Sequence, residues 1–495
     1  MDRHEKFTRN WAALLLGVAI VISLVALCTN INGPVLDSYG FRQTQTAISA
    51  YYIALGGPIF SYETPVFGPP WAIPFEFPTI QILAAALHFV GVPLDAAGRL
   101  VSYFFYVACL IPIYFLTKAA NLPRNSFWVM GALFMAAPIH LFWGRTFLIE
   151  TGALFFSLCW LAVFITVLKH TRATLGSVVL ALLAGCMAAL TKSTTFIPVV
   201  LFAFFWFVPV AARRYASGGL KEMLRIACIA AGITLIPLLV GLGWVMWSDS
   251  LKTANEMGAM LTSKALLAWN FGSLEQRFSP LVWAMFENRS LKDVFGTVPY
   301  IAIASLGVYF AKPGYRWFAS CCIAVTIGTL LILTNLHFVH SYYLVSIAVF
   351  AIFPVAIAVA QLDKVPAAIL LVLLMASQVF HFYGEPNRLI QTDHSLASEY
   401  RIAIDVAKLT NPGDVILVIG HDWDSTIPYY SQRRSQILPD WAPQKQFDDK
   451  LAQARSYGAV VLCNHPNEKV IAARATLLSD GFSEIQREDR CAIYR

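Results

Sequence analysis

Charge is what this sequence has least of. Of its 495 residues, 13% are Asp, Glu, Lys or Arg and 58% are hydrophobic, whereas roughly 25% charged residues are typical of a soluble protein. The 36 basic and 29 acidic side chains leave a net charge of +7. So few charges cannot cover the surface of a soluble protein of this size, which excludes an ordinary cytosolic enzyme. Disorder is excluded because disordered chains are poor in apolar residues, so the composition indicates a polytopic membrane protein.

Several motifs are also absent. There is no Gly-x4-Gly-Lys-[Ser/Thr] loop, so an ATPase is not expected, and no pattern of basic and aromatic residues that would indicate a nucleic-acid partner. Seven of the nine cysteines lie in apolar runs without the spacing of metal ligands. The other two, Cys463 and Cys491, lie in the C-terminal tail. They are able to form a disulfide if that tail lies outside the cytoplasm, and are otherwise free thiols.

Long apolar runs, in contrast, are abundant. Eleven are predicted to span the membrane, at 11–30, 99–117, 127–143, 152–168, 175–190, 197–211, 226–247, 297–311, 317–334, 342–360 and 365–382. The first has no small-residue cleavage site behind it, so we interpret it as a span and not as a signal peptide. A shorter run at 78–92 is interpreted as an interfacial or re-entrant helix.

Basic clusters predict the orientation of these spans, because excess Lys and Arg marks cytoplasmic loops. The clusters are Lys118 with Arg124, Lys169 with Arg172, Arg213 to Arg225, Lys312 with Arg316, and Lys364. All of them fall on the cytoplasmic side if the chain has 11 spans and a cytoplasmic N-terminus. An odd number of spans then places the C-terminus outside the cytoplasm.

The predicted fold class is a polytopic α-helical membrane protein of about 11 spans with a small C-terminal α/β domain. We expect a transmembrane domain over 1–382, with outer loops at about 31–98 and 248–296, and an extracytoplasmic α/β domain over 383–495. In the α/β domain, strands are predicted at 414–420 and 459–463, helices at 447–457 and 466–479, and a final pair of strands at 482–494.

The first outer loop contains a predicted amphipathic helix. Its apolar face consists of Ala47, Ile48, Tyr51, Tyr52 and Leu55, and the opposite side of Arg42, Gln43, Gln45, Thr46 and Ser49. This pattern suits a helix lying along the membrane surface.

Polar side chains from four different loops are expected at one depth, the outer ends of the spans. They are Asp37, Arg145, Glu150, Lys192, His337 and His340. Charge near a bilayer is costly, so this clustering indicates a function. A lipid-linked phosphate would lie at the same depth.

Structural interpretations of these residues stay open. Asp37 is a favoured N-cap for the helix that follows it. Arg145 and Glu150 suit an ordinary interfacial ion pair, and Lys192 suits a side chain that snorkels from a helix end.

The remaining candidates also have both a structural and a functional interpretation. His337 and His340 suit interface anchors next to an aromatic belt. Glu63 and Glu76 lie in the proline-rich part of the first loop, where an exposed carboxylate is usually inert. Glu76, however, stands between Phe75 and Phe77, which favours its desolvation.

The order of these features resembles the GT-C superfamily of membrane glycosyltransferases. The features are an acidic residue after the first span, a long first outer loop, Arg-x4-Glu at 145–150 and His-x-Tyr-Tyr at 340–343. The runs at 37–47 and 75–78 are similar to those of many bacterial members. The branch that the chain most resembles contains the lipid A aminoarabinose transferase and the protein O-mannosyltransferases, and the resemblance covers roughly 1–380.

The resemblance implies roles for individual residues. It makes Asp37 the catalytic carboxylate and general base, and Glu150 the acidic residue near the donor phosphate or a metal. Arg145, His340 and Tyr343 match positions that approach the lipid phosphate. The complete candidate site comprises Asp37 as the catalytic residue; Arg42, Arg145, Glu150, Lys192, His337, His340 and Tyr343 for the donor and its phosphate; and Glu76, Glu63 and Gln43 as further candidates.

One departure from the family concerns lysine. The aminoarabinose transferases carry a phosphate-binding Lys in the first loop, whereas this chain has no Lys between Phe7 and Thr117. The phosphate must then be bound by Arg42, Arg145 or Lys192.

The chemistry that we expect needs no cofactor. A polyprenyl phosphate is a good leaving group, so a carboxylate base and cations suffice, and one base with displacement at the anomeric carbon predicts inversion. A retaining route would need Glu76 or Glu150 as a nucleophile. A divalent cation on Asp37 and Glu150, as in the oligosaccharyltransferase branch, is the weaker alternative.

The predicted function is transfer of a sugar from a polyprenyl-phosphate donor to a glycan, lipid or protein acceptor at the outer face of the bacterial inner membrane. Two alternatives stay open: a transporter or flippase of lipid-linked glycans, and an oligosaccharyltransferase or polymerase using a diphosphate-linked donor. A flippase would need charged residues deep within the spans, whereas here they gather at the outer ends.

Overall fold

The computed structural model describes residues 3–169, 174–296, 300–464 and 467–495. The described chain forms two compact units that do not follow chain order. Unit 1 comprises Met1–Thr29, Arg99–Trp244 and Leu267–Ile390, and unit 2 comprises Asn30–Gly98, Val245–Leu266 and Gln391–Arg495. The first outer loop therefore groups with the C-terminal tail.

Unit 1 is a bundle of apolar helices. Its helices are α1 (Arg3–Cys28), α4 (Leu94–Ala108, from Arg99 on), α5 (Leu110–Ala119), α6 (Ser126–Ala136), α7 (Pro138–Trp143), α8 (Glu150–Lys169), α9 (Leu175–Lys252, up to Trp244), α10 (Leu267–Phe271), α11 (Leu274–Phe278), α12 (Pro280–Asp293), α13 (Tyr300–Phe310), α14 (Pro313–Ile332), α15 (Thr334–Val339), α16 (Leu344–Val359), α17 (Lys364–Gly384) and α18 (Pro386–Gln391, up to Ile390). Within the described residues, seven helices are long and apolar enough to cross a membrane. α16 lies at the centre of the bundle, because all its residues except Ala358 are buried and it packs against α6, α13 and α14.

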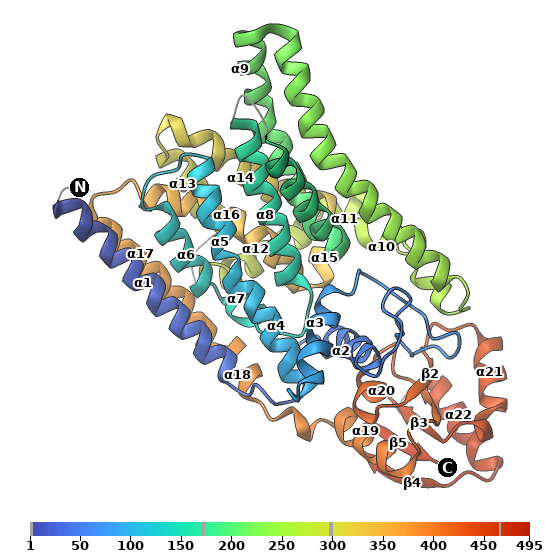
Figure 1. Cartoon of the computed structure of the whole chain (residues 1–495). Helices are drawn as coiled ribbons and strands as arrows, with labels where there is room; N and C mark the ends of the chain where they lie inside the picture. Colours follow the sequence, from blue (N-terminus) through green and yellow to red (C-terminus); the bar gives the residue numbers. More distant parts are fainter. Residues whose placement is uncertain (1–2, 170–173, 297–299, 465–466) are drawn as a thin grey trace. The chain divides into compact units, whose positions relative to one another are not determined.

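Each of the eleven predicted runs coincides with helical structure over most of its described residues; positions 297–299 of the run at 297–311 lie outside the described part of the chain. Helix α9 covers three of the runs, which are separated from one another by interruptions of the helix at Lys192 and at Gly219. Gly219 has φ +68°, which a residue without Cβ adopts at little cost, and Figure 1 shows the long hairpin that results. The run at 127–143 is divided into α6 and α7, because Pro138 holds Ala137 in an extended conformation.

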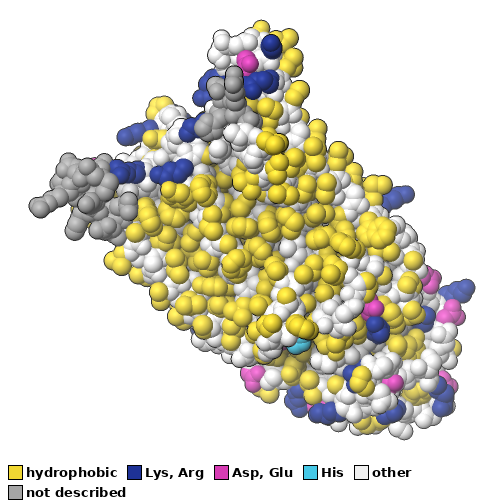
Figure 2. All heavy atoms as spheres, in the orientation of Figure 1, with side chains coloured by type: hydrophobic (Ala, Val, Ile, Leu, Met, Phe, Trp, Pro, Cys, Tyr) yellow, Lys and Arg dark blue, Asp and Glu magenta, His cyan; other side chains and the backbone are white. Residues whose placement is uncertain are grey.

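The surface of the bundle has the character of a membrane protein. Figure 2 shows hydrophobic side chains covering the visible face of the helices, with Lys and Arg gathered at the end that holds the turn of the α9 hairpin. Leu183, Leu239 and Leu373 are each more than half exposed. Water would not favour so many exposed apolar side chains, which a lipid environment accommodates.

Unit 2 contains a five-stranded mixed sheet. Its strands are β1 (Val415–Ile419), β2 (Arg434–Leu438), β3 (Ala459–Cys463), β4 (Glu484–Glu488) and β5 (Cys491–Tyr494), in the order β2-β1-β3-β5-β4. β1 is parallel to β2 and β3, and β5 is antiparallel to β3 and β4. The helices of the tail are α19 (Ser398–Leu409), α20 (Thr426–Ser431), α21 (Gln444–Ala452) and α22 (Glu468–Ser479).

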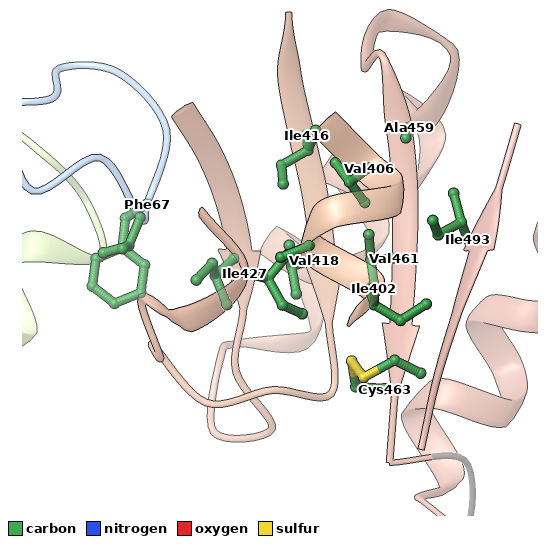
Figure 3. Packing of buried hydrophobic residues seen from close by; sticks show 14 of the residues in the cluster. Phe67, Ile402, Val406, Ile416, Val418, Ile427, Ala459, Val461, Cys463 and Ile493 are labelled. Atoms are coloured by element: carbon green, nitrogen blue, oxygen red, sulfur yellow. A yellow bond between two sulfur atoms is a disulfide. The ribbon is translucent and has the colours of Figure 1, made fainter. Parts of the chain in front are cut away.

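The strands β1 and β3 are buried on both faces of the sheet, which explains why they are continuously apolar. Ile416, Val418 and Val461 point into one core, shown in Figure 3. Leu417 and Val460, one residue away along their strands, point into the core on the other face. The small C-terminal α/β domain was thus predicted correctly.

Segments of the first loop complete unit 2. The backbone of 65–68 pairs with the edge strand β2: Ser435 N–H donates to Pro65 O (3.0 Å) and Ile437 N–H donates to Val66 O (2.7 Å). The loop therefore covers an edge that would otherwise be free to pair with other strands.

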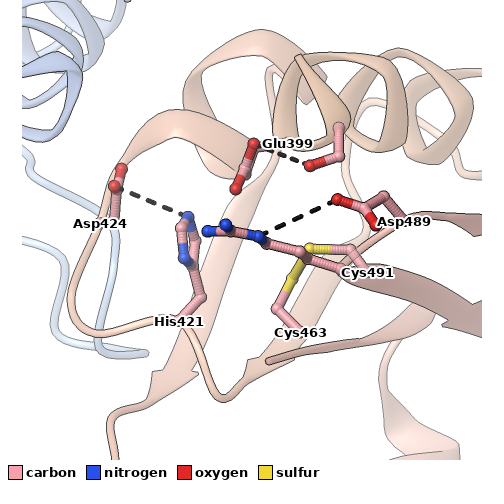
Figure 4. Close-up of a disulfide and its surroundings, with 8 residues drawn as sticks. Glu399, His421, Asp424, Cys463, Asp489 and Cys491 are labelled. Atoms are coloured by element: carbon pink, nitrogen blue, oxygen red, sulfur yellow. Dashed lines mark hydrogen bonds and ion pairs between the residues drawn. A yellow bond between two sulfur atoms is a disulfide. The ribbon is translucent and has the colours of Figure 1, made fainter. Parts of the chain in front are cut away.

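Cys463 and Cys491 form a disulfide, as one of the two sequence interpretations required. The two residues are directly opposite each other in β3 and β5, and Figure 4 shows the bond and its surroundings. The described free cysteines all belong to unit 1.

The first-loop helices were predicted with partial success. The run at 78–92 forms the helix α3 (Thr79–Phe89), and the amphipathic helix is α2 (Gly40–Ala54). A surface helix should expose its polar side, but Gln43, Gln45 and Ser49 are buried. Their expected exposure was wrong, because Ser49 Oγ is hydrogen-bonded to Thr64 Oγ1 (3.1 Å) inside unit 2.

Candidate functional site

In unit 1, a buried ion pair joins two of the predicted residues. Glu150 is the first residue of α8, and Lys192 lies at the interruption of α9 in an extended conformation. Lys192 Nζ donates to Glu150 Oε1, and each residue is 3% exposed. Lys192 therefore does not snorkel to solvent, and the ion partner of Glu150 is Lys192 and not Arg145.

Two tyrosine rings surround the ammonium group of Lys192. They belong to the short 3-10 helix Ser341–Tyr343, and the Lys192 Nζ atom lies 4.0 Å from the Tyr343 ring centroid and 5.2 Å from that of Tyr342. A cation at this distance from an aromatic face is stabilised electrostatically, the more so when desolvated. The tyrosines thus form the wall of a charged site and are not a lipid-facing belt.

His337 and His340 lie beside these tyrosines. The His337 ring is 5.9 Å from that of Tyr343, and the His340 ring is 5.1 Å from that of Tyr342. Burial, together with the positive charges of Lys192 and Arg289, lowers the pKa of His337 to about 3. His337 is therefore a neutral hydrogen-bonding group and supplies no charge for a phosphate.

We call Glu150, Lys192, His337, His340, Tyr342 and Tyr343 the Lys192 cluster. Two of its buried atoms, Glu150 Oε2 and His337 Nε2, have no hydrogen-bond partner within the described part of the chain. A buried polar atom without a partner usually costs about 1–3 kcal/mol. Such atoms are typical of a site that a ligand completes.

Among the buried or partly buried arginines of unit 1, the sequence predicted a function for Arg145 but not for Arg289. Arg145, a predicted phosphate ligand, is 1% exposed and donates from Nη2 to Thr29 O (3.1 Å). Arg289 was missed, although its Nη1 donates to His337 O (2.7 Å) and Phe338 O (2.8 Å) and so holds the backbone beside the cluster. No sequence motif singles out this arginine. Arg99, buried completely in α4, was missed too.

In unit 2, Asp37 is a buried carboxylate. It is 3% exposed and accepts a hydrogen bond from Gln43 Nε2 (2.7 Å), which also donates to Ser38 O (2.8 Å). Helix α2 begins at Gly40 after the left-handed residue Tyr39, with no side-chain cap. The N-cap interpretation of Asp37 was therefore wrong, and Gln43 holds its carboxylate in place.

Arg42 and Glu76 lie near each other in the same unit. Their closest charged atoms, Arg42 Nη2 and Glu76 Oε1, are 3.7 Å apart, and Arg42 Nη1 also donates to Gln45. The Tyr62 hydroxyl donates to Glu76 O (2.9 Å) and fixes its backbone. Both charged side chains are partly exposed, so Glu76 is less desolvated than its aromatic neighbours in sequence suggest.

Glu63 has a partner in the tail. Arg434 donates to its two oxygens, from Nε (2.8 Å) and Nη2 (3.0 Å). The neighbouring Arg433 is 6% exposed and donates to the carbonyls of Ala407 and Thr410, so its guanidinium holds segments of the tail together.

No group of three or more His, Cys, Asp or Glu side chains is positioned to hold a metal ion among the residues that the structure describes. The divalent cation on Asp37 and Glu150 therefore stays a prediction that follows from the family resemblance alone.

Comparison with known proteins identifies the fold. The chain matches no family model and no curated protein. It is similar in structure to ArnT from Cupriavidus metallidurans bound to undecaprenyl phosphate, with a TM-score of 0.66 and 14% identity, over 98% of each chain. The arabinofuranosyltransferase AftD from mycobacteria is similar with a TM-score of 0.57 and 15% identity, over 98% of this chain and 40% of that one.

A third similar structure is the archaeal oligosaccharyltransferase AglB from Archaeoglobus fulgidus, solved with an inhibitory peptide and a dolichol-phosphate. Its TM-score is 0.57 and its identity 14%, over 93% of this chain and 70% of that one. The chain therefore has an ArnT-like fold, and the predicted fold class, a polytopic helical membrane protein with a small C-terminal α/β domain, is confirmed.

Proposed function

We propose that this protein is a membrane glycosyltransferase that moves a sugar from a polyprenyl-phosphate donor to an acceptor. The observation that carries the proposal is the structural likeness to ArnT over 98% of each chain, in a structure that holds undecaprenyl phosphate. The buried Lys192 cluster supports it, because a desolvated lysine with incompletely bonded neighbours suits an anionic ligand.

Lys192 is assigned to the donor phosphate. As the bond from the anomeric carbon to the phosphate oxygen breaks, negative charge grows on the phosphate, and a buried cation stabilises it strongly. The neutral His337 contributes hydrogen bonding only. Glu150 Oε2, which has no described partner, is free to accept a hydrogen bond from a sugar hydroxyl.

Asp37 is assigned as the general base. Its carboxylate takes the proton of the acceptor hydroxyl while that oxygen forms the new bond to the anomeric carbon. The hydrogen bond from Gln43 orients the carboxylate through Oδ1. Attack by the acceptor opposite the departing phosphate inverts the anomeric configuration.

The Cys463–Cys491 disulfide supports the proposed location. Disulfides persist in oxidising compartments, so the tail that contains this bond belongs outside the cytoplasm. With the basic clusters inside, this gives a cytoplasmic N-terminus and transfer at the outer face of a bacterial inner membrane.

The test uses the purified full chain in nanodiscs with radiolabelled polyprenyl-phosphate sugars and a mixture of glycan, lipid and peptide acceptors. We expect transfer by the wild type. In Asp37→Asn, the transfer rate should fall by about 100-fold or more, while donor binding is retained. Asp405→Asn, which removes a carboxylate that pairs with Lys408 on the surface of the tail, is the matched control and should transfer normally.

Three results would contradict the proposal. Wild-type transfer rates in Asp37→Asn would remove the base assignment. Movement of lipid-linked glycan across liposomes without covalent transfer would establish a flippase instead, and a strict need for a diphosphate carrier and a divalent metal would indicate an oligosaccharyltransferase or polymerase.

A further inference from the structure

Unit 2 has a surface pocket of about 370 Å³ beside the end of α2 and the start of β2. Its walls include Tyr51, Tyr52, Gly57, Glu63, Gln432 and Arg434. Pockets for small ligands usually have about 300–1,000 Å³ and combine aromatic walls with a few oriented polar groups. This pocket therefore has the size and lining of a binding site.

The polar groups of the pocket are held rigidly. Glu63 and Arg434 bind each other through two hydrogen bonds, and the hydroxyl of Tyr51 donates to Gln432 Oε1 (3.2 Å). The neighbouring Arg433 is fixed by backbone carbonyls. A ligand would therefore meet preorganised groups, which lowers the entropic cost of binding.

The same groups keep donors and acceptors for a ligand. Arg434 uses Nε and Nη2 on Glu63, and its Nη1 forms no hydrogen bond with any described residue; nor does Gln432 Nε2. Each of these nitrogens carries two N–H donors, and carboxylate and amide oxygens accept more than one hydrogen bond. The pocket lining thus offers a ligand both donors and acceptors.

Aromatic surface adjoins these groups. The Arg434 guanidinium lies 5.0 Å from the Tyr52 ring centroid and 5.8 Å from that of Trp71, so it covers these rings. Tyr51 is only partly buried, and its ring stands at 81° to that of Tyr52. Tyr51 therefore offers an aromatic surface beside the polar wall.

A phosphate or other small anion is the weaker fit. The charge of Arg434 is matched by Glu63, and the donors of Arg433 are used on carbonyls. A sugar ring suits the lining better, because its C–H face packs on an aromatic ring while its adjacent hydroxyls bind planar groups that both donate and accept.

We propose that this pocket binds a carbohydrate, and that in the reaction this carbohydrate is the glycan part of the acceptor. Only the second half rests on the proposed function. Exposed apolar residues follow the pocket rim along the chain, with Leu55 65% and Phe60 60% exposed. The sugar therefore comes either from a free glycan or from a membrane glycolipid.

The experiment is saturation-transfer NMR on the full chain in nanodiscs with a panel of methyl glycosides: hexoses, N-acetylhexosamines, deoxyhexoses and uronic acids. A parallel series uses the matching octyl glycosides. We expect at least one sugar type to bind the wild type, and its affinity to fall by about tenfold, or about 1.4 kcal/mol, in Tyr51→Ala and in Gln432→Gly, since each variant loses a contact with the sugar.

The variants are chosen to leave the fold intact. Gln432 has φ +54°, a conformation that glycine adopts readily, and Tyr51→Phe keeps the ring while removing its hydroxyl. Tyr51→Phe should retain most of the affinity. Trp441→Ala, which removes a partly exposed aromatic ring outside the pocket, should bind as the wild type does.

The outcomes separate the sources of the sugar and the two proposals. Binding of methyl glycosides indicates a free glycan, and binding of octyl glycosides alone, weakened in Leu55→Ser, indicates a glycolipid. No binding in either series, or equal binding by Tyr51→Ala and the wild type, overturns the proposed sugar-binding role of the pocket. The proposed sugar transfer is unaffected by these results. Sugar binding without any transfer from a polyprenyl-phosphate donor overturns the function and retains the pocket.

Discussion

The two units of this molecule differ in how their charged side chains are hydrogen-bonded. In unit 2, Glu63 has both oxygens bound by Arg434, and Asp95 accepts hydrogen bonds from Tyr429 and Tyr430. In unit 1, Lys192 neutralises Glu150, but one oxygen of that carboxylate has no described partner. The difference teaches that a buried carboxylate with an incompletely bonded oxygen, such as Glu150, indicates a site that a ligand completes.

The largest expected effect comes from Lys192→Met, which leaves Glu150 buried and unpaired. Breaking a buried ion pair on one side costs about 3–5 kcal/mol, so we expect a large fall in the thermal stability of the nanodisc sample, together with lost donor binding. The double variant Lys192→Met/Glu150→Gln should regain most of the stability but not the donor binding.

Lys252→Met is the control for the Lys192 experiment, because Lys252 is a buried lysine of unit 2 paired with Asp249. It should keep donor binding. If the double variant of the Lys192 cluster bound donor normally, the cluster would be structural, and the contrast between the units would disappear.

The second effect concerns the cysteines, which also differ between the units. The Cys463–Cys491 bond closes a loop with a sequence separation of 28, and such a loop contributes about 3–4 kcal/mol by restricting the unfolded chain. The double substitution of both cysteines by serine should lower the unfolding temperature of unit 2, measured by limited proteolysis during heating. Cys109→Ser in unit 1 should not do so, and equal protease sensitivity of all three proteins would contradict the prediction.

The third effect is a pH dependence confined to unit 1. The pKa of His337 is about 3 in the folded chain against an ordinary value of 6.5, so unfolding takes up a proton below pH 6.5. The contribution of the neutral His337 ring to the free energy of unfolding is complete above pH 6.5 and is lost as the pH falls toward 3. Thermal unfolding between pH 8 and 4 should therefore show a shallower slope in His337→Asn than in the wild type.

His88→Asn is the matched control for the pH series, since the His88 side chain of unit 2 is only partly buried. It should keep the wild-type slope. Parallel slopes for His337→Asn and the wild type would show that His337 is not the group that takes up the proton.

The smallest effect is expected for Glu76→Gln. Its partner Arg42 is 3.7 Å away and both side chains are partly exposed, and pairs of this kind contribute less than about 1 kcal/mol. A chemical unfolding curve should barely move. A loss as large as that of Lys192→Met would place Glu76 among the buried functional charges.

Hydropathy predicted most of the helical architecture, because a bilayer-spanning helix must be continuously apolar. The same rule predicted β1 and β3, which are apolar on both faces. Strand β2 was not predicted, because its first three residues, Arg434-Ser-Gln, are polar and its apolar residues begin only at Ile437. Its backbone is fixed instead by pairing with β1 and with the first loop.

The candidate site was predicted less completely. The ends of the predicted helices supplied Glu150 and Lys192, which the structure places together, but not their pairing; their role toward a donor stays a prediction. Sequence proximity suggested that Glu150 pairs with Arg145, whereas its partner is Lys192. Long-range pairing depends on how helices pack, which a pattern of local hydropathy does not encode.

The interruption of α9 at Lys192 has a consequence for the biosynthesis of the chain. Only one extended residue separates the helical segments on either side, so we expect the two segments to enter the bilayer together. A lysine in the membrane costs about 2.5–3.5 kcal/mol during insertion, but Glu150 is synthesised 42 residues earlier. At about 5–20 residues per second, the carboxylate is synthesised several seconds before the lysine that it neutralises. Glu150 is therefore already present to pair with Lys192 when the lysine enters the membrane.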